Sequence, residues 1–463
     1  MKPISLFLAL LLCFTLCNSV AVAENEAPET FTCGDYEYRL LEDGTAEIIR
    51  YNGADTKLTI PNVLDGYPVT GIGQNSFSAC FYLSSITIPD GIISIGDEAF
   101  SWCSGLIDLN IANSVTTIGD FSFDLCSGLT TVTLPDSIVS IGLNPFRDCT
   151  KLTSIKVSSN HPTLAVIENV LFEKTTKSLI CYPSGKTGVT YNIPQGVRRI
   201  GNAAFYKCTK LMDINIPDSV EIIGDSAFSG CEKLLDITIP EGVTSLESFA
   251  FYNCTNMMKV SIPYSVVFIG SNPFAHCQKL FYISLPWNHP SFDVVDDVLF
   301  EKSTKRLICY PLGRTGSSYN VPQGTLCIGE YAFSECEELT EITLPNSITA
   351  IGDYAFSWCN RLSYVIIPDA VTIIGDSAFA GCSKLTTVKI PDGTTTIGDF
   401  AFYACTSLTG VTIPESVITI GHHAFDKCEE LTVIVGQNSF AEQYCTDESI
   451  PCTYPDSLDW LNH

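Results

Sequence analysis

Positive charge is scarce in this chain of 463 residues. It has 25 lysines and arginines against 51 aspartates and glutamates, and these four residue types make up only 16% of the composition. The net charge of -26 repels phosphate backbones and anionic lipid headgroups. We therefore expect no nucleic acid partner and no binding to membrane surfaces. A hydrophobic fraction of 46% still allows the chain to bury a large core.

The chain also lacks the usual catalytic and metal-binding motifs. Neither Cys-x-x-Cys nor His-Glu-x-x-His occurs, and there are only six histidines. The segment SGKT at 184–187 has the end of a phosphate loop, but Ile180 stands where that loop needs glycine. Ser226 and Ser377 lie in Gly-Asp-Ser-Ala segments whose serine is replaced in equivalent segments, which argues against a nucleophile. We predict a protein that is not an enzyme, with no catalytic, cofactor-binding or metal residues.

Long hydrophobic runs are absent beyond the first residues. Lys2 precedes an apolar run over 4–16, and Ala21-Val22-Ala23 has the small-x-small pattern of a cleavage site. These features predict a signal peptide over 1–23. No later run is long enough to cross a bilayer as a helix. We therefore expect a secreted or cell-surface protein without a transmembrane segment.

Cysteine, in contrast, is abundant and periodic. From Cys80 to Cys428, thirteen of the 21 cysteines follow a phenylalanine by three residues, and the step between them is 23 residues except for two steps of 59. The longer steps hold two related inserts, at about 158–194 and 286–322, which are 128 residues apart. A fixed period in this range predicts a solenoid of stacked coils. The periodic positions are Cys80, Cys103, Cys126, Cys149, Cys208, Cys231, Cys254, Cys277, Cys336, Cys359, Cys382, Cys405 and Cys428.

Each repeat unit has the pattern of one coil. After the cysteine, Leu129, Val132 and Leu134 show the alternation of a strand with one buried face, and proline ends that strand. Val-x-x-Ile-Gly then turns the chain, with glycine free to adopt positive φ. Asp-x-Ala-Phe predicts a short helical turn with aspartate as its cap. Calcium binding by the row of aspartates is the less favoured alternative. That row contains Asp97, Asp120, Asp225, Asp353, Asp376 and Asp399.

The pattern C-x-x-L-x-x-I-x-I-P-x-x-V-x-x-I-G-x-x-A-F resembles the BspA-like, or Treponema-type, leucine-rich repeat proteins. The resemblance implies a leucine-rich-repeat solenoid with a parallel sheet on one face, short helical turns and loops on the other, β-hairpin inserts and terminal caps. It places an N-terminal hairpin cap at 24–57, the solenoid at 58–435 and a C-terminal cap at 436–463. Members are largely surface or secreted proteins of host-associated microbes, and some are adhesins.

Most of the cysteines are expected to be buried thiols. The periodic ones occupy one interior position in every coil, where cysteine acts as a small hydrophobic residue. Cys445 and Cys452 differ, because they lie outside the repeats and only seven positions apart. A disulfide between these two is a candidate feature of the C-terminal cap.

The outward strand positions are mainly serine and threonine, which fits strand propensity alone. Aromatic residues interrupt this face near the second insert, and we predict a binding surface at Phe281, Tyr282, Trp287 and Tyr364. The alternative is that these side chains pack beneath the insert. We expect a monomeric, non-enzymatic, adhesin-like scaffold with an unknown protein or glycan ligand. A carbohydrate-binding or carbohydrate-active extracellular protein is the second hypothesis.

Overall fold

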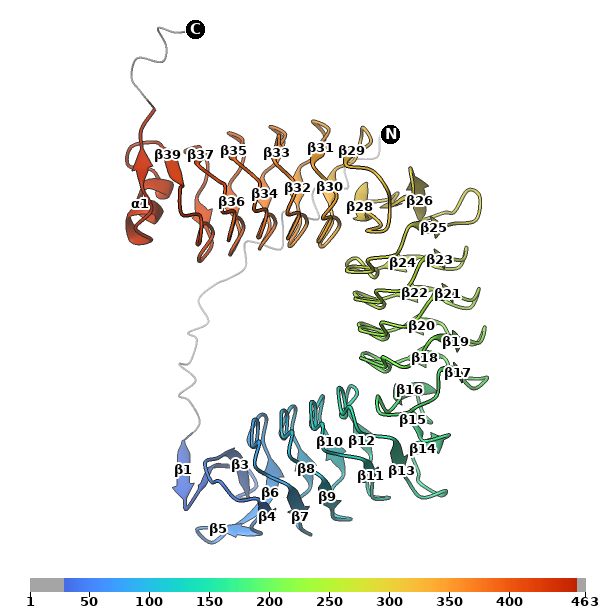
Figure 1. Ribbon diagram of the computed structural model, residues 1–463. Coiled ribbons are helices and arrows are strands. Elements are labelled where there is room, and N and C mark those ends of the chain that lie inside the picture. The colour runs from blue at the N-terminus through green and yellow to red at the C-terminus, as the bar shows by residue number, and fades with distance from the viewer. Residues whose placement is uncertain (1–28, 456–463) are drawn as a thin grey trace, which may run out of the picture.

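The computed structural model describes residues 29–455, and the chain winds into a parallel β-solenoid (Figure 1). The solenoid prediction is therefore confirmed, while the predicted signal peptide lies outside the described residues. Three straight stacks of coils meet at two bends, so that the described chain has the outline of an open C. One insert lies at each bend, between β13 and β17 and between β25 and β29.

The longer strands form the outer face of the C, and neighbouring coils pair in parallel with a shift of one repeat, as Thr131 pairs with Ser154. These strands are β4 (Lys57–Thr59), β7 (Ser85–Ile88), β9 (Asp108–Ile111), β11 (Thr131–Thr133), β13 (Ser154–Lys156), β17 (Thr190–Asn192), β19 (Asp213–Asn215), β21 (Asp236–Thr238), β23 (Lys259–Ser261), β25 (Tyr282–Ser284), β29 (Ser318–Asn320), β31 (Glu341–Thr343), β33 (Tyr364–Val365), β35 (Thr387–Lys389), β37 (Gly410–Ile413) and β39 (Thr432–Val435).

A second row of short parallel strands occupies the segment expected to be only a turn. It consists of β6 (Tyr67–Ile72), β8 (Ser94–Ile95), β10 (Thr117–Ile118), β12 (Ser140–Ile141), β18 (Arg199–Ile200), β20 (Ile222–Ile223), β22 (Ser245–Leu246), β24 (Phe268–Ile269), β30 (Cys327–Ile328), β32 (Ala350–Ile351), β34 (Ile373–Ile374), β36 (Thr396–Ile397) and β38 (Thr419–Ile420).

The ends and inserts have their own elements. The N-terminal end has β1 (Thr30–Cys33), β2 (Tyr36–Leu40), β3 (Ala46–Tyr51) and β5 (Val63–Leu64). Strands β2 and β3 form the expected antiparallel hairpin. The inserts are three-stranded antiparallel sheets, β14 (Leu164–Ile167), β15 (Val170–Glu173) and β16 (Ser178–Cys181), then β26 (Phe292–Val295), β27 (Val298–Glu301) and β28 (Arg306–Cys309). The C-terminal end has α1 (Phe440–Asp447) and β40 (Cys452–Thr453).

The Asp-x-Ala-Phe segment forms consecutive turns, and the expected short helix is absent from the coils over 58–435. Glu98 and Trp102 have left-handed backbone with φ of 52° and 64°. This alternation points their N–H groups, and that of Phe100, toward the next coil. The three N–H groups donate to the carbonyls of Asp120, Ser122 and Asp124 at 2.9, 2.8 and 2.8 Å. Coil-to-coil bonding therefore replaces the hydrogen bonds of a helix.

The aspartate row serves the same coil-to-coil bonding, so its expected capping role is wrong. Asp97 Oδ1 accepts the backbone N–H of Asp120 at 2.7 Å, and Asp120 Oδ1 accepts that of Leu143 at 2.7 Å.

The glycine of each Ile-Gly pair also serves the contact between neighbouring coils. A Cβ on Gly119 would lie 2.4 Å from Asp97 Oδ1, and the φ of Gly119 is outside the left-handed region. Glycine is needed there for the close approach of two coils, and the expected positive φ is absent.

The phenylalanines form stacked ladders through the core. Centroids of Phe77, Phe100 and Phe123 lie 5.0 and 5.2 Å apart along the first stack, and the same stacking recurs in the other two. The cysteine ladder runs beside it. The thiol of Cys126 donates to the carbonyl of Phe100 in the preceding coil at 3.2 Å, a contact repeated along each stack. Cysteine is therefore both a small core residue and a weak donor.

These buried thiols make stability depend on pH in the alkaline range. Burial raises the pKa of Cys277 from 9.0 to about 12 and that of Cys149 well above 9.0. The unfolded chain loses these protons near pH 9 while the folded chain keeps them, so unfolding becomes more favourable as pH rises toward 12. A thiol in the unfolded chain has a pKa of about 8.5, so the effect should begin near that pH. We therefore expect the urea midpoint, followed by circular dichroism, to fall steadily from about pH 8.5 to about pH 10.5. The Cys277→Ala variant should show a shallower fall, and an unchanged midpoint in both proteins would contradict the prediction.

Each insert sheet separates two hydrophobic cores and packs against both. In β15, Leu171 belongs to the core of the first stack, whereas Val170 and Phe172 belong to the core of the middle stack. In β27, Leu299 faces the middle core and Phe300 faces the core of the last stack. Because alternate residues of a strand point to opposite faces, one three-stranded sheet can cover the ends of two stacks. The inserts thus cover the ends of the hydrophobic cores at the bends of the solenoid.

Candidate functional site

The four residues predicted to form a binding surface are all exposed. The exposed fractions are 42% for Phe281, 46% for Tyr282, 94% for Trp287 and 52% for Tyr364. These values do not fit the alternative in which the aromatic side chains pack beneath the insert. Exposed aromatic side chains on a strand face are typical of interaction surfaces.

The bend divides these residues into two groups. Tyr282 lies on β25, in the sheet formed by β21, β23 and β25, while Tyr364 lies on β33, in the sheet formed by β29, β31 and β33. The second insert lies between the two sheets (Figure 1). Phe281 is next to Tyr282 and has the ammonium group of Lys259 5.9 Å from its ring centroid. The sequence placed all four residues near one insert, and the structure puts Tyr364 on the far side of the bend.

Tyr364 lines a shallow groove on the outer face of the last stack. The groove crosses β33, β35 and β37, has a volume of about 480 Å³, and its wall includes Tyr364, Ile366, Thr387, Lys389 and Thr412. Its floor is open at Gly410, where a Cβ would have no neighbour within 4 Å. Ile366, with 64% of its surface exposed, gives the groove an apolar wall.

The sequence analysis did not identify Gly410 as part of a site. The missing side chain is the signal in the sequence, because equivalent outward positions carry Thr387 and Tyr364. Lys389 and Asp369 add one charge of each sign to the wall of the groove. The arrangement suits a ligand with an apolar group flanked by polar groups.

A second depression lies on the outer face of the middle stack and is acidic. It has a volume of about 740 Å³ and is lined by Asp213, Asp236 and Ser261 on β19, β21 and β23, and by Glu241 in the loop after β21. It lies on the same stack as Tyr282. The outer face therefore has an acidic region before the second bend and an apolar groove after it.

Two buried histidines in the loops before the insert sheets have structural contacts. His161 Nε2 lies 3.1 Å from the carbonyl of Pro135, and His161 Nδ1 accepts the backbone N–H of Leu164 at 3.1 Å. His289 makes the equivalent contacts with Pro263 and Phe292. Both rings are buried, and these contacts use both nitrogens to fix the loop before the insert.

One group near the C-terminal end has the composition of a metal site. Ligand atoms of His423, Asp426 and Glu448 lie within 4.8 Å of one another. His423 Nδ1 and Asp426 Oδ2 are 2.8 Å apart in an exposed pair.

The serines in the Gly-Asp-Ser-Ala segments have local roles, since Ser226 donates to Asp225 Oδ1 at 2.7 Å and Ser377 is buried.

The candidate disulfide pair lies together at the C-terminal end. Cys445 is buried in α1 and Cys452 is on β40, and both are free thiols in this structure. Burial, together with the neighbouring thiol of Cys452, raises the pKa of Cys445 to about 12. A disulfide between them stays a prediction for the oxidised protein.

Comparison with known proteins identifies the repeat. The family model described as BspA type Leucine rich repeat region (6 copies) matches residues 70–192, 186–305 and 315–443. A leucine rich cell surface protein from Faecalibacterium prausnitzii A2-165 is 30% identical, with 90% of this chain and 97% of that chain covered and a TM-score of 0.48. None of the curated proteins compared with the chain matches it.

Two further solved structures are more distant. A leucine-rich repeat protein from Eubacterium ventriosum is 23% identical, with 77% of this chain and 95% of that chain covered and a TM-score of 0.45. The pneumococcal vaccine antigen PcpA is 20% identical, with 89% of this chain and 82% of that chain covered and a TM-score of 0.31. Within residues 29–455, no helix has the length and hydrophobicity needed to cross a membrane.

Proposed function

Since the chain belongs to the BspA type leucine-rich repeat family, we propose that it is a secreted or cell-surface scaffold that binds a protein partner in an adhesin-like role. The groove at Tyr364 and Ile366 supports this proposal most directly. It exposes two large hydrophobic side chains on a strand face whose other outward residues are mainly polar. In a solenoid, such surface residues are free to vary because they do not hold the coils together.

Carbohydrate binding is the second candidate. Trp287 is almost fully exposed, and the acidic depression with Asp213 and Asp236 lies on the neighbouring stack. Aromatic faces and carboxylates are the groups with which proteins bind sugar rings and their hydroxyls. A glycan array distinguishes the two candidates, because saturable binding to one sugar class would favour the second.

Replacing Tyr364 with serine should weaken partner binding at least tenfold, about 1.4 kcal/mol, because an aromatic anchor is lost. The test compares capture of host mucosal proteins by wild-type protein and variants, with each captured protein identified by mass spectrometry and its affinity then measured. Tyr82→Ser is the matched control, since Tyr82 is 77% exposed on the first stack. Tyr282→Ser reports separately on the surface before the bend.

The thermal midpoint of the Tyr364→Ser variant should stay unchanged, since half of the side chain is exposed. A partner that binds the Tyr364→Ser variant as tightly as wild type would overturn the assignment of the groove. Fractionation of cells that express the chain tests the proposed location, which an exclusively cytoplasmic protein would contradict.

A further inference from the structure

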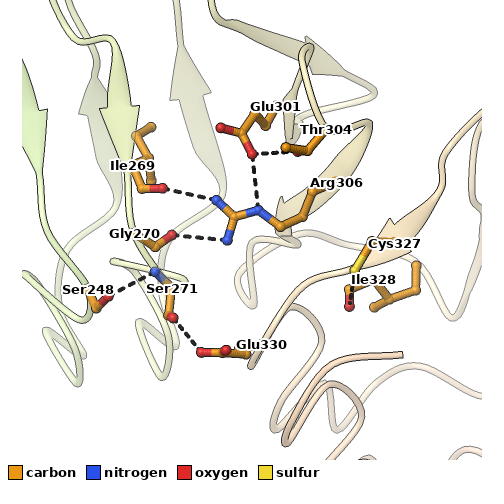
Figure 2. A network of polar contacts seen from close by, with 10 residues as sticks. All are labelled: Ser248, Ile269, Gly270, Ser271, Glu301, Thr304, Arg306, Cys327, Ile328 and Glu330. Atoms are coloured by element: carbon orange, nitrogen blue, oxygen red, sulfur yellow. Dashed lines mark hydrogen bonds and ion pairs between the residues drawn. The ribbon is translucent and has the colours of Figure 1, made fainter. Parts of the chain in front are cut away.

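The two bends have equivalent construction, and comparing them identifies a second site. Figure 2 shows the second bend, where the guanidinium of Arg306 on β28 reaches back to the end of the middle stack. Its Nη2 donates to the carbonyl of Ile269 at 3.0 Å and its Nη1 to the carbonyl of Gly270 at 3.4 Å. Its Nε donates to Glu301 Oε2 at 3.3 Å. Arg306 thus joins three acceptors from the stack and the insert.

The bend itself explains why these carbonyls need a donor. Inside a stack, the isoleucine carbonyl accepts the glycine N–H of the next coil, as Gly119 donates to Ile95 at 2.8 Å. At the bend the next coil is displaced by the insert, so the carbonyl of Ile269 has no such partner. The carbonyl of Gly270 also lacks a donor inside its own turn, because Pro273 has no N–H. The side chain of Arg306 supplies the missing donors.

The first bend has the same acceptors but no arginine at this position, and its own Arg199 lies on the next strand, where the second bend has Cys327. Ile141, Gly142 and Glu173 stand 128 positions before Ile269, Gly270 and Glu301, and Ser178 takes the place of Arg306. Among residues 29–455, no backbone donor outside the strand ladders reaches the carbonyl of Ile141 or Gly142. Among the described residues no guanidinium donates to these two carbonyls, and beside them lies a pocket of about 450 Å³ lined by Ile141, Gly142, Asn144, Glu173 and Ser178.

Two further features of the pocket favour a ligand that donates hydrogen bonds. Asn144 is 3% exposed, and its Oδ1 is buried without a hydrogen-bond partner. Arg199 also lines the pocket, and its Nη2 donates to Glu247 Oε2 and to Asn202 Oδ1, each at 2.9 Å, so that its charge is paired with Glu247. The carboxylate of Glu173 is held only by the hydroxyl of Thr176 among the described residues. A carboxylate and several oxygen acceptors therefore remain for a cationic group.

We propose that this pocket binds an arginine side chain of a protein partner, in the place that Arg306 fills at the other bend. The inference rests on the proposed function as a protein-binding scaffold and names one chemical group of the partner. A guanidinium has five N–H donors in one plane, which matches acceptors spread over the stack and the insert. The net charge of -26 also favours a basic partner.

The test uses the full chain and a capped Gly-Arg-Gly peptide, with a Gly-citrulline-Gly peptide as the neutral control. Ligand-observed NMR should show saturable binding of the arginine peptide and at least tenfold weaker binding of the citrulline peptide. Ser178→Arg should abolish binding, because the new side chain fills the pocket as Arg306 does. Arg306→Ser should open a second pocket and raise the number of bound peptides from one to two.

Circular dichroism of both variants verifies that they fold, and either variant alone suffices for the test. Equal binding of the two peptides, or full binding by Ser178→Arg, would overturn the proposal. Displacement of the arginine peptide by calcium chloride at a micromolar concentration would also overturn it, because the pocket would then be a metal site. Partner binding that depends on Tyr364 without any arginine-peptide binding would reject this inference alone. Arginine-peptide binding without a Tyr364-dependent partner would reject the proposed groove alone.

Discussion

Replacing Phe402 with alanine should lower the free energy of unfolding by about 3–5 kcal/mol, the usual cost of truncating a buried phenylalanine. Phe402 is fully buried between Phe379 and Phe425, with ring centroids 5.2 and 5.3 Å away. Alanine would leave a cavity and remove two stacked contacts at once. Because each coil touches only its neighbours, the last stack should open at lower urea concentration than in wild type. Urea unfolding followed by circular dichroism measures the change.

Phe400→Ala is the matched control for this prediction. Phe400 belongs to the same coil but is 39% exposed and contacts the ring of His423 outside the core. Its removal should cost less than about 1 kcal/mol, as for most surface substitutions. Equal costs for the two variants would show that the ladder stabilises the stack no more than an exposed ring does.

The periodic features of this fold were predictable because a repeat states the same residue preference many times. The spacing of Phe100 and Phe123 alone indicates stacked coils, and the structure confirms that their rings stack at 5.2 Å. The thiol contact was harder to foresee. Burial of Cys126 follows from the pattern, whereas its bond to the carbonyl of Phe100 depends on the offset between neighbouring coils.

The turns were predicted wrongly for a physical reason. Asp-x-Ala-Phe has the residues of a capped helical turn, but a helix would use its N–H groups within the segment. In the solenoid, left-handed residues such as Glu98 direct these groups to the next coil, where a continuous row of carbonyls is available. Hydrogen bonding between coils therefore outweighs the helical propensity of the segment. The sequence of a single repeat unit cannot reveal this, because the acceptors lie in the next coil.

The candidate site was predictable only in part, because a binding surface depends on how the stacks are oriented. Exposure of Tyr282 and Tyr364 followed from their outward strand positions, and the structure confirms it. Their separation by the bend could not be read from the insert sequence. The pocket at Ser178 became visible only when the two bends were compared, since serine in a strand gives no signal of a missing guanidinium.

Gly398→Ala should destabilise the protein by about 1–3 kcal/mol, as expected when a group is added to a closely packed position. A Cβ at Gly398 would lie 2.4 Å from Asp376 Oδ1 and 2.5 Å from the backbone nitrogen of Asp376. Backbone cannot move aside as a flexible side chain can, so the two coils must separate. The bond from the N–H of Asp399 to Asp376 Oδ1, now 2.8 Å, should then lengthen or break.

The chain itself contains one exception that supports this reasoning. Glu247 stands where other coils have the glycine of the Ile-Gly pair. Asp225, in the preceding coil, has hydrogen-bond partners that differ from those of the other aspartates in the row. Asp225 Oδ1 accepts the hydroxyl of Ser226 at 2.7 Å, and the backbone N–H of Asp225 donates to Glu247 Oε2 at 3.1 Å. Adding a Cβ at this position therefore removes the aspartate from its coil-to-coil bond, and a long acidic side chain compensates. Gly398→Ala would likewise remove Asp376 from its coil-to-coil bond, but the alanine side chain could not accept a hydrogen bond in compensation.

Gly410→Ala provides the control, because a Cβ at Gly410 would meet no atom within 4 Å. It should stabilise the chain by about 0.5–1 kcal/mol, since glycine loses more backbone freedom on folding than alanine does. The two substitutions are chemically identical and twelve positions apart. Opposite signs in urea unfolding would establish that close approach between coils requires the Ile-Gly glycine. The same sign and size for both would mean that chain flexibility alone decides, and the packing argument would fail.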